Sequence, residues 1–169
     1  MFSMFFPDAT ADSSYTVDYD KLYREGIRGI IYDIDNTLVP HGAPADDRAI
    51  AHFEKLKEMG MKSCLISNNQ KPRVEMFNEK IGTEYIYNAH KPSTRNYLKA
   101  CEIMGLDKSQ VIFIGDQLFT DVWGAKRAGI RNILVKPIHP KEEIQIVLKR
   151  RLEWIVLYFY RKQLRKKGA

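Results

Sequence analysis

Short apolar runs alternate with amphipathic segments along most of this chain. The apolar runs predict buried strands at residues 28–33, 62–67, 84–87, 111–114 and 132–135. Between them, apolar residues at helical spacing predict helices over 46–59, 71–81, 90–104 and 120–128. This alternation predicts an α/β fold of three layers, Rossmann-like, in which helices cover both faces of a parallel five-stranded sheet.

Both ends of the chain depart from this alternation. Residues 1–6 are mostly apolar, and we expect them to pack on the body as an arm, because they are too short for a signal peptide and lack its basic start. Residues 141–167 predict one long helix that can dock on the body or on a second subunit. Its apolar residues at helical spacing are Ile144, Val147, Leu148, Leu152, Ile155 and Phe159. We expect residues 1–169 to form a single domain with its core at about 26–137.

Composition narrows the class of protein. Hydrophobic residues make up 44% and charged residues 28% of the chain, as in soluble globular proteins. No apolar run approaches the roughly 18 residues that a membrane-spanning helix needs, so we expect a cytoplasmic protein. The two cysteines lie in apolar patterns and the four histidines show no metal-ligand spacing, which disfavours a disulfide or a zinc site. The net charge of +6 resides in residues 141–169, which hold nine of the basic residues but only three acidic ones.

Two acids follow the first expected strand. Asp33 and Asp35 come directly after the apolar run 30–32, and in extended chain residues i and i+2 point to the same side. Two carboxylates there suit a hard cation held by oxygens, or a nucleophile beside a general acid. The alternative is a turn with a helix cap, since Asp, Asn and Thr favour turns.

Polar residues also follow the other expected strands. Ser67 and Asn68 end the second strand, Lys91 precedes a helix, and Asp116 and Asp121 follow the fourth strand. Because the carboxyl ends of parallel strands share one edge of the sheet, these residues should converge there. Acids with a hydroxyl, an amide and a lysine suit Mg²⁺ together with a phosphate. Taken singly, Asp121 can be a helix cap, Lys91 a solvated lysine and Ser67-Asn68 a turn.

Together these segments resemble the four motifs of the haloacid dehalogenase superfamily of phosphohydrolases, over residues 29 to about 135. The first motif is Asp-x-Asp-x-Thr after an apolar strand. The resemblance implies that Asp33 is a nucleophile forming an aspartyl-phosphate, while Asp35 protonates the leaving oxygen and then activates water. It also implies Mg²⁺ as the cofactor, held by Asp33, the main-chain carbonyl of Asp35 and Asp116, with Asp121 supporting them.

The same resemblance implies how the phosphate is held. Ser67 would bind the phosphoryl oxygens, and Lys91 would offset charge on the nucleophile and the phosphate. Asn68 and Thr37 are expected as secondary phosphate contacts. Only about ten residues separate Asp35 from the next helix, and three separate the end of the third strand from Lys91. Those are the superfamily's usual insertion points for a cap domain, so we expect no cap and a site open to large substrates.

The chain as a whole is similar to the YqeG-type branch of the superfamily, which is related to mitochondrial phosphatidylglycerophosphate phosphatase. This similarity implies a phosphomonoester substrate that is an anionic phospholipid, phosphatidylglycerophosphate, at the inner face of the membrane. Residues 154–160 are apolar all round the expected helix and are flanked by basic clusters, as in helices that lie peripherally at a membrane surface.

Three rival interpretations of that helix remain: packing on the core, a homodimer interface, or contact with nucleic acid. The rival functions are a soluble phosphatase for a small metabolite or phosphoprotein, and a non-enzymatic binder of nucleic acid or the ribosome. The intact pair of Asp33 and Asp35 speaks against the non-enzymatic binder.

Overall fold

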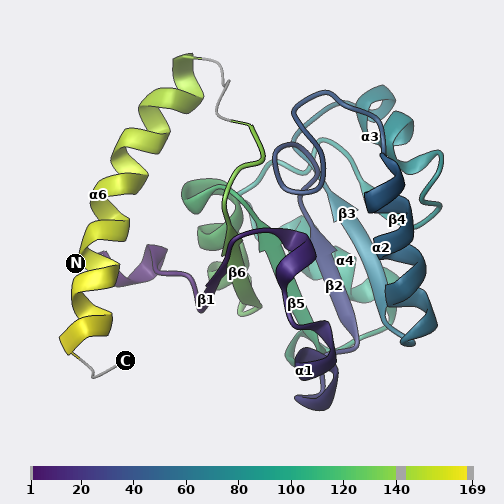
Figure 1. Cartoon of the computed structure of the whole chain (residues 1–169), viewed down its shortest axis with the longest axis horizontal. Coiled ribbons are helices and arrows are strands. Elements are labelled where there is room, and N and C mark those ends of the chain that lie inside the picture. Colours follow the sequence, from purple (N-terminus) through teal and green to yellow (C-terminus); the bar gives the residue numbers. More distant parts are fainter. Residues whose placement is uncertain (1, 140–143, 167–169) are drawn as a thin grey trace.

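The computed structural model describes residues 2–139 and 144–166, without the side chains of 144–147, and its centre is one parallel sheet (Figure 1). The strand order is β1-β6-β5-β2-β3-β4, and every neighbouring pair is parallel. The strands are β1 (Ala9–Ala11), β2 (Gly29–Tyr32), β3 (Lys62–Ile66), β4 (Glu84–Ile86), β5 (Val111–Gly115) and β6 (Arg131–Val135). The expected parallel α/β sheet is therefore confirmed.

The sheet has six strands, so the prediction of five was wrong. The additional strand is β1, which pairs with β6 at the edge of the sheet. Three residues are too few to produce a hydrophobic period, so this strand exists only through its pairing with β6.

Helices cover both faces of the sheet. Alternate residues of β2 point to opposite sides: Ile30 and Tyr32 join one core cluster and Ile31 joins another. The first cluster lies under α1 (Tyr19–Arg24), α2 (Asp47–Glu58) and α3 (Lys71–Asn78). The second lies under α4 (Arg95–Met104) and α5 (Trp123–Ala128). Strands buried on both faces explain why their sequences are continuously apolar.

Several helix boundaries follow from local chemistry. Asp46 caps α2 by accepting a hydrogen bond from the main-chain N–H of Ala49, and Gly129 ends α5 in the left-handed conformation that glycine adopts freely. The prediction that a helix begins at residue 90, which would place Pro92 in its first turn, was wrong. The Lys91–Pro92 peptide bond is cis, and α4 begins only at Arg95.

The segment after β5 also differs from expectation. A π-helical turn, η4 (Leu118–Val122), precedes α5, and the N–H groups of Asp121 and Val122 both donate to the carbonyl oxygen of Gln117. Asp121 thus lies inside this wide turn, and its Oδ2 accepts a hydrogen bond from the N–H of Gln117 at 3.0 Å. The turn brings its side chain back toward the end of β5.

The connections at the carboxyl edge are short. From Asp33 to Asp46 the structure contains a bridge between Asp35 and Val39 and turns, with no inserted domain. Four residues connect β4 to Lys91. Within the described residues, the expected absence of a cap at these two positions is confirmed.

The long helix α6 (Ile144–Lys166) stands beside the β1 edge of the sheet, with the N-terminal arm between them (Figure 1). A third apolar cluster joins Phe6 of the arm, Leu118 and Val122 of η4, Leu134 of β6 and Val156 of α6. The expected packing of the arm on the body is thereby confirmed.

The side of α6 that faces the body is not the one that the apolar spacing predicted. Leu148, Leu152, Ile155 and Phe159 are exposed, whereas Val156 is buried. The alternative in which these apolar residues dock on the body was therefore wrong. Buried Glu153 and half-buried Arg150 lie in the contact with the body instead. No helix in the described part of the chain combines the length and hydrophobicity needed to cross a bilayer.

Candidate active site

Three buried carboxylates meet at the carboxyl ends of β2 and β5. Asp33 and Asp116 follow these neighbouring strands, and the N–H of Asp33 extends the pairing by donating to the carbonyl oxygen of Ile114 at 3.0 Å. Asp121 approaches from η4. One carboxylate oxygen of each acid lies within 4.8 Å of the others, so the three can share one cation.

Lys91 bridges two of these acids. Its Nζ lies 2.6 Å from Asp33 Oδ1 and 2.7 Å from Asp121 Oδ1, and its side chain is almost completely buried. The amide of Asn68 fixes the main chain of Lys91: Asn68 Oδ1 accepts from the Lys91 N–H at 2.6 Å, and Asn68 Nδ2 donates to the Lys91 carbonyl at 3.2 Å. Lys91 is therefore a positioned cation rather than a solvated one.

Thr37 links the two strand-end acids. Its hydroxyl lies 3.1 Å from Asp33 Oδ2 and 3.0 Å from Asp116 Oδ1. A hydroxyl has one hydrogen, which Thr37 can share between the two carboxylates or donate to one of them. The Thr37 side chain is buried between the two strand ends and fixes their spacing.

Burial dominates the electrostatics of this cluster. It raises the pKa of Asp33 to about 6, although Lys91 opposes the shift, and it raises the pKa of Asp116 well above its ordinary value. Burial alone would lower the pKa of Lys91, but Asp121 and Asp33 more than reverse this and hold the lysine charged. The buried acids are therefore short of positive charge, which a divalent cation would supply.

Asp35 points to a second, more polar group of residues. One of its oxygens accepts from Asn69 Nδ2 at 2.7 Å. The other accepts from Arg73 Nη2 at 2.8 Å and from the Gly42 N–H at 2.7 Å, with His41 Nδ1 at 3.8 Å. Asp35 is thus held by polar partners outside the three-carboxylate cluster.

The C-terminal helix also reaches this cluster. Arg150 donates to the carbonyl and carboxylate oxygens of Asp116 and pairs with Glu153 at 3.1 Å. Glu153, itself buried, accepts from the Leu118 N–H at 2.8 Å. Arg150, more than thirty positions beyond Asp116, therefore contacts the Asp116 carboxylate.

Of the eight residues that the sequence singled out, five form one cluster and three lie around it. Asp33, Thr37, Lys91, Asp116 and Asp121 are in direct contact. Asn68 holds Lys91, and Asp35 is turned toward Arg73. The Ser67 hydroxyl is buried and accepts the N–H of Asn69 at 3.1 Å.

Sequence reasoning missed Asn69, Arg73, Arg150 and Glu153. Asn69 directly follows the Ser67-Asn68 pair, so its position was a usable signal. Arg73 lies in the first turn of α3, where the helix dipole disfavours a cation, and that mismatch was a weaker signal. The sequence around Arg150 and Glu153 gives no comparable sign.

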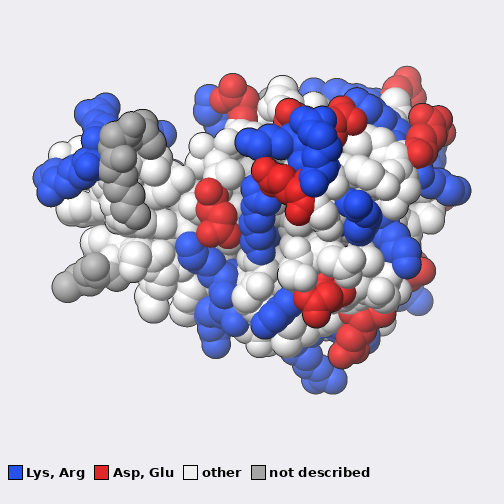
Figure 2. Space-filling view, turned by 90° about the horizontal axis from the view of Figure 1, so that it is seen from below, with Lys and Arg blue, Asp and Glu red and all other residues white. Residues whose placement is uncertain are grey.

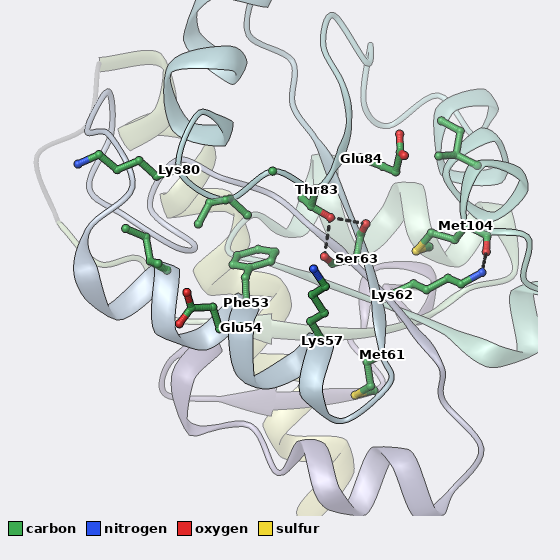
Figure 3. Close-up of a pocket in the computed structure, with 14 residues that line it drawn as sticks. Phe53, Glu54, Lys57, Met61, Lys62, Ser63, Lys80, Thr83, Glu84 and Met104 are labelled. Atoms are coloured by element: carbon green, nitrogen blue, oxygen red, sulfur yellow. Dashed lines mark hydrogen bonds between the residues drawn. The ribbon is translucent and has the colours of Figure 1, made fainter.

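A cavity of about 580 Å³ lies at the opposite, amino-terminal edge of the sheet (Figure 3). It is bounded by the starts of β3 and β4 and the ends of α2 and α4, and Ser63 and Thr83 hydrogen-bond to each other in its wall. None of the eight singled-out residues lines it. In open parallel sheets ligands bind at the carboxyl edge, so this cavity is not the candidate active site.

Comparison with known proteins defines the class. The family model described as haloacid dehalogenase-like hydrolase matches residues 42–129, just over half of the chain. The match begins after Asp33 and Asp35, so the geometry of those two acids supports the family assignment independently of the match. The chain belongs to this family and is a phosphatase within it.

Particular relatives narrow the comparison. A probable phosphatase, YqeG, of Bacillus subtilis is 42% identical over 79% of this chain and 78% of its own length. Phosphatidylglycerophosphate phosphatase 1 of Arabidopsis thaliana is 27% identical over 83% of this chain but only 44% of its own length. The cobalt-bound deoxy-D-mannose-octulosonate 8-phosphate phosphatase of Haemophilus influenzae shares the fold, with a TM-score of 0.50 and 14% identity over 69% of this chain and 81% of that one.

Proposed function

We propose that this chain is a Mg²⁺-dependent phosphomonoesterase that works through an aspartyl-phosphate on Asp33. One observation carries the proposal: Asp33, Asp116 and Asp121 are buried within 4.8 Å of one another, with Lys91 against Asp33. A nucleophilic carboxylate beside a fixed cation and a cation-binding set is what attack on an anionic phosphate requires.

The residues fit the proposed cation. Mg²⁺ binds hard oxygen ligands, typically one or two carboxylates together with waters and phosphate oxygens. Asp33, Asp116 and the main-chain carbonyl of Asp35 would hold it, and Asp121 would support them. When bound, it would screen the charge on the phosphate and polarise its oxygens.

The chain's own side chains carry the chemical steps. An oxygen of Asp33 attacks phosphorus, the bond to the leaving oxygen breaks, and Asp35 gives that oxygen a proton. Asp35 then accepts a proton from water as the water attacks the aspartyl-phosphate, which releases phosphate and restores Asp33. To reach the leaving oxygen, Asp35 turns away from Arg73 and Asn69, to which it is now hydrogen-bonded.

The remaining polar residues hold the phosphoryl group. Lys91 offsets the negative charge of Asp33 and of the phosphate. The hydroxyls of Ser67 and Thr37 are the proposed hydrogen-bond donors to the phosphoryl oxygens. The amide of Asn68 is already committed to the main chain of Lys91, so its contribution is to keep that lysine in place.

For the substrate, we propose phosphatidylglycerophosphate or a closely similar anionic phospholipid. Three features support this choice: the similarity to phosphatidylglycerophosphate phosphatase 1, the short connections around the site, and the basic, aromatic helix α6. In Figure 2, blue and red side chains are interspersed over the sheet, while the basic side chains at the far left lie on the projecting helix with no red beside them. Anionic headgroups would attract such a surface.

The first prediction tests the nucleophile. Asp33→Asn should lower the rate of phosphate release by about 10⁴-fold or more, because an amide oxygen cannot form the acyl-phosphate. Release should be measured from phosphatidylglycerophosphate in mixed micelles and from soluble phosphomonoesters, with and without chelator. Asp20→Asn, an exposed acid in α1, is the matched control and should retain full activity.

Two results would contradict the proposal at different levels. Turnover that is insensitive to chelator, or that Asp33→Asn retains, would contradict the proposed metal-dependent mechanism through Asp33. Rapid turnover of soluble esters with none of the lipid would leave the mechanism intact and favour a metabolite or phosphoprotein phosphatase. In that case the exposed stripe of α6 would be available for a second copy of the chain.

A further inference from the structure

A groove connects the candidate active site with the inner side of α6. Its volume is about 440 Å³, within the usual range for ligand pockets, and Asp116 and Arg150 line one end. The groove runs between α6 on one side and β1, β6 and the residues that follow β6 on the other. It is thus continuous with the group of side chains around the proposed cation.

The lining of this groove is partly apolar and partly charged. Apolar side chains come from both walls: Leu134, Val135, Pro137, Trp154, Leu157 and Leu164. The charges among the lining residues balance, with Arg150, Lys136 and Arg161 against Asp12, Asp116 and Glu153. Lys136 pairs with Asp12, and Arg150 pairs with Asp116 and Glu153. The groove therefore joins the ionic contact at Asp116 to apolar walls whose accompanying charges are balanced.

We propose that this groove binds the hydrocarbon part of an amphipathic phosphomonoester whose phosphate lies against Asp33. The inference rests on the proposed function and names where the rest of that substrate lies. A small polar metabolite would leave the apolar walls of the groove exposed to water, whereas a bound hydrocarbon chain would bury them.

The opposite side of α6 offers a different arrangement, in which the lipid stays in a bilayer that only touches the helix. Leu152 belongs to that outward side and is 57% exposed, and it does not line the groove. Trp154 and Leu164 line the groove and are 65% and 37% exposed, so a charge there is tolerated by the fold. These three residues allow a matched comparison on one helix.

The test is binding of alkyl phosphonates, which resemble phosphate esters but are not hydrolysed. Ethyl-, hexyl- and dodecylphosphonate would be titrated calorimetrically into the whole chain in Mg²⁺ buffer, below their micelle-forming concentrations. We expect Kd to fall about twofold to fourfold per added methylene until the groove is filled. Trp154→Glu and Leu164→Glu should each weaken dodecylphosphonate binding at least tenfold and leave ethylphosphonate unchanged, while Leu152→Glu changes neither.

Each of the following outcomes would contradict the proposal that the groove binds hydrocarbon. Equal Kd values for ethyl- and dodecylphosphonate, or no binding of either, would show that no hydrocarbon site adjoins the phosphate. Loss of the chain-length dependence in Leu152→Glu but not in Trp154→Glu would assign it to the outward side of the helix. Failure of the proposed function looks different: Asp33→Asn would keep wild-type phosphatase activity, whatever the dependence on chain length.

Discussion

Gly115 shows how a single residue can set the spacing of the site. A Cβ atom at this position would lie 2.5 Å from Asp121 Oδ2 and 2.7 Å from the Cβ of Asp121. The end of β5 can therefore approach the η4 turn only because residue 115 has no side chain. The need for this close approach, rather than for a special backbone conformation, accounts for the glycine before Asp116.

The second prediction follows from that contact. Gly115→Ala should push Asp121 away from Lys91 and lower the affinity for Mn²⁺, used as a spectroscopic substitute for Mg²⁺, by about tenfold or more. The measurement is Mn²⁺ titration followed by electron paramagnetic resonance. Gly29→Ala is the control, because its Cβ meets the movable ends of the Leu106 and Met104 side chains. It should lower stability and keep the affinity; equal Mn²⁺ affinities for both variants and the wild type would contradict the argument.

Helix α6 matters to the site through one contact between elements. Arg150 pairs with Asp116, and Glu153 joins the same helix to the main chain of η4. In the structure the guanidinium supplies positive charge to a buried acid of the cluster that is proposed to hold the cation. A cation bound by Asp116 would therefore experience repulsion from Arg150.

The third prediction concerns this repulsion. Arg150→Met keeps much of the side-chain volume and removes the charge, so Mn²⁺ should bind about threefold to tenfold more tightly. Titration of both proteins by electron paramagnetic resonance measures the change without relying on activity. Arg151→Met, at the exposed neighbouring position, should leave the affinity unaltered. Weaker binding in Arg150→Met would instead mean that Arg150 is needed to orient Asp116.

At the scale of the whole molecule, one face of the sheet contains a half-buried histidine that couples stability to pH. His52 packs against the rings of Tyr15, Tyr19 and Tyr32, and its Nε2 lies 2.9 Å from the Tyr32 hydroxyl. Burial lowers the pKa of His52 to about 4, with a smaller contribution from Lys55. Between that value and the ordinary value near 6.5, the unfolded chain takes up a proton that the folded chain does not.

The fourth prediction is the resulting loss of stability in acid. Because the folded pKa is lowered, the contribution is present above pH 6.5 and is lost as the pH falls toward 4. Between pH 7 and pH 4.5 the wild type should lose about 2 kcal/mol more unfolding free energy than His52→Gln. Urea denaturation at the two pH values gives the difference. His139→Gln removes an exposed histidine and should behave as the wild type; identical pH dependence in all three proteins would refute the assignment.

The sequence by itself determined the layered α/β fold and the residues that meet at its carboxyl edge. Hydrophobic periodicity is a local property, so the burial of β2 and β5 is visible in a few consecutive residues. Once the strands are parallel, their carboxyl ends share an edge, and Asp33 and Asp116 must lie on it whatever the strand order.

Only the tertiary structure decided which segments became neighbours. Strand β1 exists through pairing with β6, more than a hundred residues away, and Arg150 reaches Asp116 through the packing of α6 on η4. The apolar spacing of α6 equally suited the body, a partner or a membrane, and the buried Glu153 placed that stripe outward. Such choices depend on contacts between distant parts of the chain, and local patterns contain no information about them.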